Sequence, residues 1–178
     1  MIYDSTSIEG VYVFSPQVYS DFRGQNYETF NLDSKELINK LTGVDINFVS
    51  DSVSCSRKNT IRGLHGDQVT YKLITCLYGD IWFNVLDVRE HSKTAGKTFS
   101  IPLGPTNMKQ ILLPPGVVNG HLCLSDTCVF SYKLSHPYVP QDAQITKHYT
   151  SGGLYWPIDR ANAILSKRDA QALTTNLW

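Results

Sequence analysis

Short strand-like runs, rich in apolar residues and separated by turn-forming residues, recur along most of the chain. They occupy residues 10–15, 46–56, 70–78, 80–88, 97–103, 108–113, 117–124 and 128–134. Many short strands at this spacing are typical of a β-sandwich or a β-barrel. Between two of these runs, Tyr78-Gly79-Asp80 predicts a tight hairpin turn.

Two other segments have the pattern of short helices. Asp33 precedes Glu36 by three residues and stands ahead of Leu37, so it is the expected N-cap of the first helix. Ser166 precedes Asp169 by three residues, a pattern similar to a capping box, and predicts a second short helix. We therefore expect an all-β fold with short flanking helices.

Alternation along the predicted strands places several polar side chains on faces that also carry apolar residues. Lys72 and Tyr132 each share a face with apolar neighbours, and Asn119 and His121 lie two residues apart on one face. In a β-barrel, such faces point towards the interior cavity. The pattern therefore predicts a polar cavity inside the barrel.

Each candidate residue also has an ordinary structural explanation when it is taken alone. Lys72 could extend its ammonium to solvent from a strand edge, and Tyr132 could be a core tyrosine with a satisfied hydroxyl. His65 lies at a strand end, where a histidine is usually solvated, and Asp169 could serve only to cap a helix. The single residues leave the chemistry open.

Composition narrows the class of protein. The 178 residues match one domain, which we expect to span residues 1–178. Sixteen basic and sixteen acidic residues give a net charge of zero, which argues against a nucleic-acid or anionic-membrane binder. With 42% hydrophobic residues, the chain has the material for a sizeable core.

The N-terminal residues have no signal-peptide pattern, and no run is long enough for a membrane span. The four cysteines have no CxxC spacing, and Cys76 and Cys123 lie in apolar runs, so we expect buried free thiols in a cytoplasmic protein. The five histidines form no HxH, HxxxH or HExxH motif, and phosphate-binding loops are absent from the sequence. Neither a metal nor a nucleotide cofactor is predicted.

Seven segments, in order along residues 21–169, resemble motifs of one enzyme family. They are D-F-R-G at 21–24 followed by Glu28, I-R-G-L-H at 61–65, K-L at 72–73 followed by Gly79, D-V-R at 87–89 followed by Ser92, P-G at 115–116, Y-K at 132–133 followed by Tyr138 and Pro140, and L-S-K-R-D at 165–169. By these motifs the chain resembles the dTDP-4-dehydrorhamnose 3,5-epimerase family. The resemblance implies a cupin-like jelly-roll barrel and a homodimer.

The resemblance also implies a reaction. It is the cofactor-independent epimerisation, at C3, C5 or both, of a nucleotide-linked 4-keto-6-deoxy sugar for polysaccharide biosynthesis. A proton next to the C4 carbonyl is removed to give an enolate, and a proton returned to the opposite face inverts the carbon. The resemblance assigns the base to His65, its orientation to Asp169, the acid to Tyr132 and stabilisation of the C4 oxygen to Lys72.

Substrate binding is implied for six further residues, which are Arg23, Glu28, Arg62, Asn119, His121 and Tyr138. Arg23 and Arg62 are expected to hold the diphosphate, because a guanidinium fork suits two anionic groups.

Some positions depart from the family pattern. Ser50 and Ser52 stand where Gln and Asn are usual, and Asn119 replaces a His, with His121 on the same face two residues later. The form H-G-D-x-x-T-Y-K-L at residues 65–73 and the N-x-H arrangement are similar to a branch acting on GDP-linked 4-keto heptoses. The nucleotide, whether dTDP, GDP or CDP, is left open by the sequence.

Two alternative functions also fit the sequence. One is a nucleotide-sugar 3,4-ketoisomerase, which uses a related enolate in the same fold. The other is a catalytically inactive paralogue that only binds a sugar nucleotide, and the altered nucleotide contacts motivate it.

Overall fold

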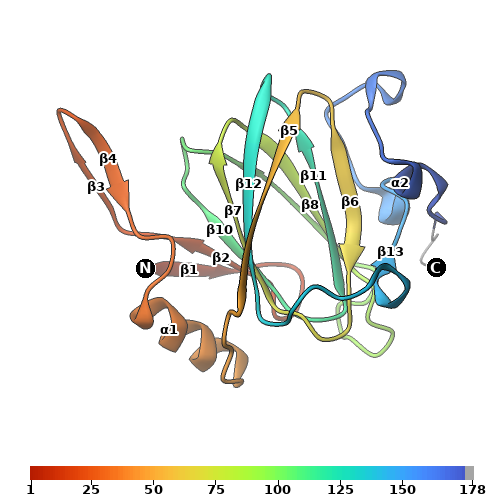
Figure 1. Cartoon of the computed structure of the whole chain (residues 1–178). Coiled ribbons are helices and arrows are strands. Elements are labelled where there is room, and N and C mark those ends of the chain that lie inside the picture. The colour runs from red at the N-terminus through yellow and green to blue at the C-terminus, as the bar shows by residue number, and fades with distance from the viewer. Residues whose placement is uncertain (175–178) are drawn as a thin grey trace.

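The computed structural model describes residues 1–174 and contains two antiparallel sheets that face each other (Figure 1). The larger sheet has the order β1 (Ile2–Ser5), β2 (Tyr12–Ser15), β10 (Gln110–Leu113), β7 (Lys72–Tyr78), β12 (Thr127–Leu134) and β5 (Ser50–Arg57). The smaller sheet has the order β13 (Ile145–Thr146), β6 (Ile61–Gly66), β11 (Val117–Cys123), β8 (Ile81–Asp87) and β9 (Thr98–Leu103). The predicted all-β jelly roll is confirmed, and each of the eight predicted runs overlaps one strand.

The apolar core lies between the two sheets. Ile74 of β7 and Phe130 of β12 belong to one buried cluster with Phe83 and Val85 of β8. Burying a side chain of this size contributes ~1.5–3 kcal/mol. Side chains alternate between the two faces of a strand. Residues two positions away from these core residues on the same strand therefore also point towards the interior. The buried free thiols predicted at two positions are confirmed.

The two predicted helices are present, with one corrected boundary. Helix α1 (Leu32–Thr42) begins after Asn31, whose Oδ1 accepts a hydrogen bond of 2.9 Å from the Ser34 N–H. The predicted cap at Asp33 is therefore wrong, because Asn31 and Ser34 form a reciprocal capping box two residues earlier. Helix α2 (Lys167–Gln171) begins after the predicted cap, Ser166. Among the described residues, no helix is long and apolar enough to cross a membrane.

The predicted hairpin at Tyr78-Gly79-Asp80 is wrong. Strand β7 pairs with β10 and β12, whereas β8 pairs with β9 and β11, so the turn carries the chain from one sheet to the other. Strand β5 also begins at Ser50, four residues later than the predicted run.

A separate hairpin, β3 (Val18–Asp21) with β4 (Gly24–Tyr27), projects away from the two sheets (Figure 1). We call residues 18–27 the arm. Most of its residues are exposed on both faces, so they carry no alternation of apolar and polar positions. This explains why the sequence pattern does not reveal its strands, and the exposed strand β1 was missed for the same reason.

The C-terminal segment packs against the smaller sheet. It contains β13 and the short helices η1 (Gln141–Ala143), η2 (Ser151–Gly153) and η3 (Arg160–Asn162), followed by α2. Trp156 packs in one cluster with Leu64 and Leu86, and Trp82 Nε1 and Asn84 Nδ2 both donate to the Tyr155 carbonyl, at 3.1 and 2.8 Å. These contacts hold the C-terminal segment on the smaller sheet and so position α2 at the end of β6, where the candidate site lies.

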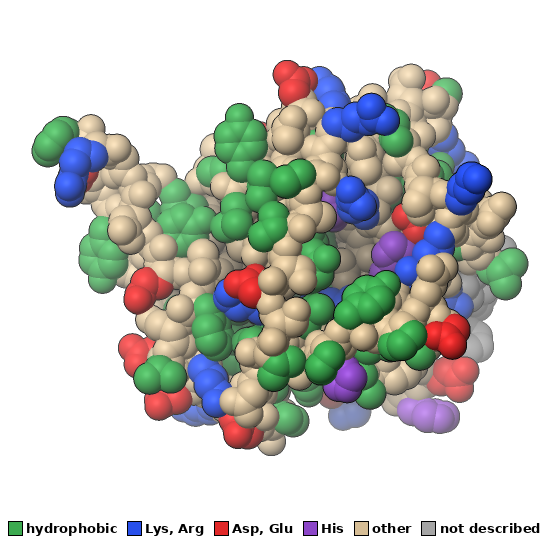
Figure 2. Space-filling model, viewed as in Figure 1, with side chains coloured by type: hydrophobic (Ala, Val, Ile, Leu, Met, Phe, Trp, Pro, Cys, Tyr) green, Lys and Arg blue, Asp and Glu red, His purple; other side chains and the backbone are tan. Residues whose placement is uncertain are grey.

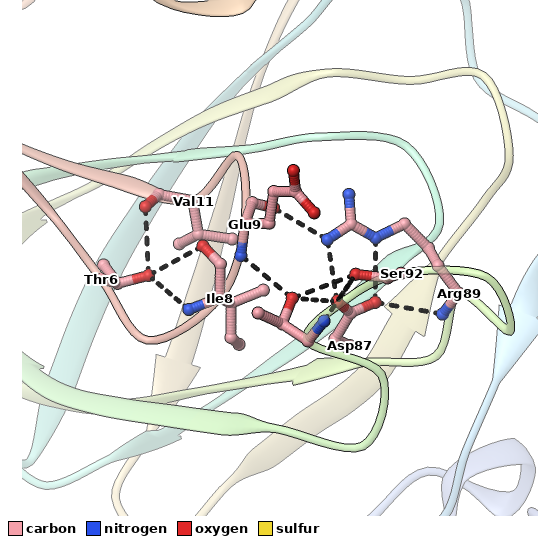
Figure 3. Close-up of polar contacts among 8 residues, drawn as sticks. Thr6, Ile8, Glu9, Val11, Asp87, Arg89 and Ser92 are labelled. Carbon is pink, nitrogen blue, oxygen red and sulfur yellow. Dashed lines mark hydrogen bonds and ion pairs between the residues drawn. The ribbon is translucent and has the colours of Figure 1, made fainter.

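One motif used for the resemblance has a structural role here. The buried Asp87 carboxylate accepts hydrogen bonds from Arg89 and Ser92, and Arg89 Nη2 donates to the Glu9 carbonyl at 2.7 Å (Figure 3). Burial alone would raise the pKa of Asp87, but these donors and Thr94 lower it to about 2. The network ties the N-terminal segment to the loop after β8.

Candidate active site

A cavity of about 890 Å³ opens between the two sheets. Eight of the ten residues predicted for the site line it: His65, Lys72, Tyr132, Asp169, Arg62, Asn119, His121 and Tyr138. Figure 2 looks onto this side, where histidine, basic and acidic side chains gather around the hollow between β5 and β6. Strands far apart in the sequence therefore bring their polar side chains to one cavity.

A bulge in β6 brings Arg62 and His65 to the same cavity. In a regular strand, residues three apart point to opposite faces. Here His65 pairs with Asn119 and Arg62 with His121, so β6 has one more residue than β11 between the two pairs. A bulge of this kind reverses the alternation and is common next to active sites. Both side chains consequently line the cavity.

Gly63 makes this bulge sterically feasible. Its φ is +127°, and a Cβ at this position would lie 2.5 Å from the Gly120 Cα and 2.6 Å from the Asn119 carbonyl oxygen. A residue with a side chain would therefore push β6 away from β11. The conformation and the close approach together explain the glycine of the R-G-L-H segment.

His65 and Asp169 form a hydrogen-bonded pair. Asp169 Oδ1 lies 2.6 Å from His65 Nε2, and Asp169 is 2% exposed. Burial alone would raise the pKa of Asp169, but the hydrogen bond and charge of His65, with bonds from Ser166 and the Gly63 N–H, lower it below its ordinary value. An ionised carboxylate at Nε2 favours the tautomer with its proton there, which leaves the lone pair on Nδ1.

Lys72 reaches the same part of the cavity from the opposite sheet. Its Nζ donates to the His65 carbonyl oxygen and to Asn119 Oδ1, both at 3.2 Å. Burial lowers the pKa of Lys72 to about 8, although the charge of Asp67 acts in the other direction. The ammonium is thus held beside His65 by neutral acceptors.

His121 is buried in the cavity wall. It is 2% exposed and its ring stacks on Phe130, with centroids 4.3 Å apart and planes at 20°. Within the described chain, its Nε2 has no hydrogen-bond partner. Burial lowers the pKa of His121 to about 3, and the charges of Arg62 and His65 act in the same direction. The ring is therefore neutral and has an unused polar atom.

Tyr132 lies on β12 in the larger sheet, opposite the sheet that carries His65. In register it pairs with Ile74 on one side and Ser52 on the other. Its ring lies 5.6 Å from that of Phe130, at 40°. The cavity therefore has a histidine on one wall and a phenol on the other.

The cavity contains the predicted arginine, Arg62, and two arginines that were not predicted, Arg57 and Arg168. Arg62 is fixed by bonds from Nε to Ser56 Oγ at 2.9 Å and from Nη2 to the Cys55 carbonyl at 3.3 Å. Arg57 and Arg168 line the cavity as well, and Arg168 donates to Thr146 Oγ1. Arg168 is part of the L-S-K-R-D motif and directly precedes Asp169, so this motif could have indicated it.

Two predicted residues lie outside the cavity of this chain. Arg23 is in the arm, where its Nη2 pairs with Asp21 Oδ2 at 2.5 Å, and its side chain is 76% exposed. Glu28 follows the arm, is exposed, and accepts a bond of 2.6 Å from Asn31 Nδ2. The structure brings neither residue to the other eight.

Within residues 1–174, no group of three or more His, Cys, Asp or Glu side chains is arranged to hold a metal ion. What the cavity does hold is a histidine–aspartate pair, a lysine, a phenol and several arginines. This set can move protons and bind an anion.

Comparison with known proteins assigns this arrangement to a class. The chain matches a 35% identical dTDP-4-dehydrorhamnose 3,5-epimerase of Escherichia coli K12 over 95% of this chain and 91% of that protein. A dTDP-6-deoxy-D-glucose-3,5-epimerase of Legionella pneumophila in complex with dTDP-4-keto-L-rhamnose has a TM-score of 0.89 and 30% identity, covering 99% and 93% of the two chains. A 3'-monoepimerase of Streptomyces bikiniensis in complex with dTDP-quinovose has a TM-score of 0.86 and 28% identity, covering 95% and 85%.

The fold and the cavity thus define a cupin-like sugar epimerase, an enzyme of the isomerase class. The family model for dTDP-4-dehydrorhamnose 3,5-epimerase matches residues 5–176. The chain belongs to the dTDP-4-dehydrorhamnose 3,5-epimerase family.

Proposed function

We propose that this protein epimerises a nucleotide-diphosphate-linked 4-keto-6-deoxy sugar at C3, C5 or both, through an enolate and without a cofactor. One observation carries the proposal: the His65–Asp169 pair on one wall of the cavity faces Tyr132 on the other. Inversion needs a base on one face of the sugar ring and an acid on the opposite face.

In the proposed first step, His65 Nδ1 removes the proton from C3 or C5. Asp169 supports this step because its carboxylate accepts the Nε2–H and stabilises the imidazolium that forms. The electron pair of the C–H bond forms the carbon–carbon double bond of the enolate. The negative charge moves to the C4 oxygen, where the Lys72 ammonium stabilises it.

In the second step, the Tyr132 hydroxyl donates a proton to the opposite face of the same carbon. The electron pair of the carbon–carbon double bond forms the new C–H bond, the pair on the C4 oxygen re-forms the carbonyl, and the carbon is inverted. Proton exchange with water then restores the phenol and the neutral imidazole. No electrons leave the substrate, so the proposed reaction needs no redox partner.

The arginines support a diphosphate as the anionic part of the substrate. Among the residues that the structure describes, three arginines and Lys72 line the cavity, against the two carboxylates of Asp67 and Asp169. A chain with no net charge thus concentrates positive charge at one place. Arg62, held by Ser56, is the proposed principal contact to the diphosphate.

We also propose a homodimer, with a second copy of this chain as the partner. The arm exposes Phe22 (97%) and Tyr19 (68%), and Val53 on the edge strand β5 is 57% exposed. A second copy would cover this edge, which otherwise invites aggregation. It would also offer its Arg23 and Glu28 to a cavity other than its own.

Mixed dimers test this assignment of Arg23. Arg23→Ala and His65→Asn are each expected to be inactive as homodimers. If Arg23 serves the partner's cavity, unfolding and refolding the two variants together should restore activity, because one site of each mixed dimer is then complete. Light scattering that shows a monomer, or mixtures as inactive as the single variants, would contradict the proposed dimer role.

For the nucleotide, we propose a GDP-linked sugar. One support is the H-G-D-x-x-T-Y-K-L segment. The other is that Ser50 and Ser52 line the cavity at positions where the family usually has the larger side chains of Gln and Asn. The hexose or heptose character of the sugar is a further outcome of the same test.

The decisive experiment is incubation in D₂O with dTDP-, GDP- and CDP-linked 4-keto sugars. The expected result is deuterium at C3, C5 or both, with inverted configuration, and the fastest exchange with the GDP-linked substrate. Product NMR separates epimerisation from 3,4-ketoisomerisation, because only the latter moves the carbonyl. No incorporation from any of these substrates would overturn the proposed function and favour the inactive sugar-nucleotide-binding alternative. The relatives are named epimerases, so neither alternative is favoured.

A further inference from the structure

The Lys72 ammonium forms no salt bridge with a carboxylate among residues 1–174, although the charge of Asp67 favours its charged form. Its two hydrogen bonds go to the His65 carbonyl and to Asn119 Oδ1. An ammonium has three donors, so one N–H remains. Because Lys72 lines the cavity, that donor is available to a substrate.

The same contact fixes which way the Asn119 amide points. Lys72 can only donate, so the Asn119 atom that faces it must be the oxygen. The NH₂ group is then on the other branch of the amide, and among the described residues no acceptor bonds to it. Asn119 also lines the cavity, so its N–H donors are offered there.

Asn119 is next to the proposed base as well as to Lys72. It pairs in register with His65 across β6 and β11, at the edge of the bulge. The amide, the ammonium and the imidazole consequently converge on one part of the cavity. In the proposed reaction, this is where a C–H bond breaks and charge grows on the neighbouring oxygen.

We propose that Asn119 is a catalytic residue that donates its side-chain N–H to the C4 oxygen while its Oδ1 positions Lys72. The inference rests on the function proposed above and adds a second donor to the oxyanion site. When His65 takes the proton, the C–H electrons become the new double bond and the carbonyl pair moves to oxygen. Two donors then meet that oxygen, and both are released when the carbonyl is restored.

Two donors of different kinds make the site tolerant of pH. Burial lowers the pKa of Lys72 to about 8, so the ammonium loses its charge just above neutral pH. The amide of Asn119 does not titrate and keeps donating. Its oxygen also favours the charged form of Lys72, because an ammonium donates a stronger hydrogen bond than a neutral amine does.

Two variants separate the two roles. Asn119→Leu keeps the approximate volume and removes both the acceptor and the donor, so we expect kcat to fall about 10²-fold with a smaller change in KM. The alkaline limb of the kcat profile should move to lower pH. Asn119→Asp puts a carboxylate beside the ammonium, so kcat should stay low while the alkaline limb moves to higher pH.

The matched control is Asn162→Leu, an exposed asparagine on η3, which should change neither kcat nor the pH profile. NMR titration of the Lys72 ε-CH₂ group, without substrate, gives a readout independent of turnover. Its pKa should fall in the leucine variant and rise in the aspartate variant. Thermal unfolding of each variant shows that it is folded, and the aspartate variant serves if the leucine variant is not.

The outcomes are distinguishable from those for the proposed function. If wild-type protein exchanges no deuterium, the proposed function is wrong, whereas the NMR titration still tests the Asn119–Lys72 contact. If wild type exchanges and Asn119→Leu keeps its kcat and its pH profile, the catalytic role is wrong. A rise in KM alone would make Asn119 a substrate-binding residue only, which would also overturn the inference.

Discussion

Asp169 Oδ1 lies 2.6 Å from Nε2 of His65, although 104 residues separate the two along the chain. Three features create this contact. The β6 bulge turns His65 into the cavity, the Ser166 cap starts α2 at the right place, and the C-terminal segment packs on the smaller sheet through Trp156. The pair is thus a product of the tertiary fold.

Asp169→Asn tests what the carboxylate contributes. An amide cannot stabilise the imidazolium as an anion does, and its NH₂ group can hold the histidine in the wrong tautomer. We expect kcat to fall by about 10²-fold or more, with KM changed less, measured by deuterium incorporation in D₂O. Asp126→Asn, at a fully exposed side chain, is the control and should keep wild-type kcat. Equal kcat in both variants would remove Asp169 from the mechanism.

Side-chain alternation was a reliable guide to part of this site. Strands β7 and β12 lie inside the larger sheet and have one face on the core, so their apolar residues reveal which side is buried. The period of two then places Lys72 and Tyr132 in the cavity wall.

Other parts of the site depend on contacts that have no local signature. The bulge exists because Gly63 approaches Gly120 on another strand, so no pattern within β6 predicts that Arg62 and His65 share a face. The arm is exposed on both sides and lacks the apolar pattern that marks a strand. Arg57, at the end of β5, and Arg168, in α2, line the same cavity because the tertiary fold brings these two elements together.

Gly63→Ala should disrupt the bulge. The added Cβ would meet the Gly120 Cα at 2.5 Å, and the φ of +127° disfavours any residue with a side chain. We expect a loss of more than about 2 kcal/mol in the free energy of unfolding, measured with urea, together with loss of activity. Gly153 also has a positive φ, but nothing lies within 4 Å of a Cβ at this position. Gly153→Ala should therefore lower the free energy of unfolding by less. Similar losses in the two variants would show that close approach to β11 is unimportant.

Arg62→Lys probes the diphosphate contact. Lysine keeps the charge but loses the planar fork, including the bond to Ser56 Oγ. We expect KM to rise roughly 10-fold and kcat to change much less, because a uniform binding contact is weakened. Titration calorimetry with nucleoside diphosphates should show the same loss of affinity. Arg160→Lys, at an exposed arginine, is the control, and a KM effect of the same size there would contradict a specific role.

Lys72→Met should lower activity and raise stability. The pKa of Lys72 is about 8 in the fold and about 10.4 in an unfolded chain, so the unfolded state binds more protons between these values. Stability therefore rises as pH increases from about 8 to about 10.4, and the cost of burying the charge is present in full below pH 8. Methionine removes that cost, so at pH 7 the variant should gain about 1–3 kcal/mol.

The gain in Lys72→Met should shrink towards pH 10, where wild-type Lys72 is also largely neutral. Its kcat should fall at least about 10²-fold at pH 7, because the C4 oxygen loses its cationic donor, and the difference should shrink towards pH 10, where wild-type Lys72 is no longer charged either. Urea unfolding at pH 7 and pH 10 measures the first effect and deuterium exchange the second. Lys93→Met, at an exposed lysine, should change neither. A less stable Lys72→Met at pH 7, or a difference that does not vary with pH, would show that the buried ammonium carries no such cost and that its burial has been compensated within the fold.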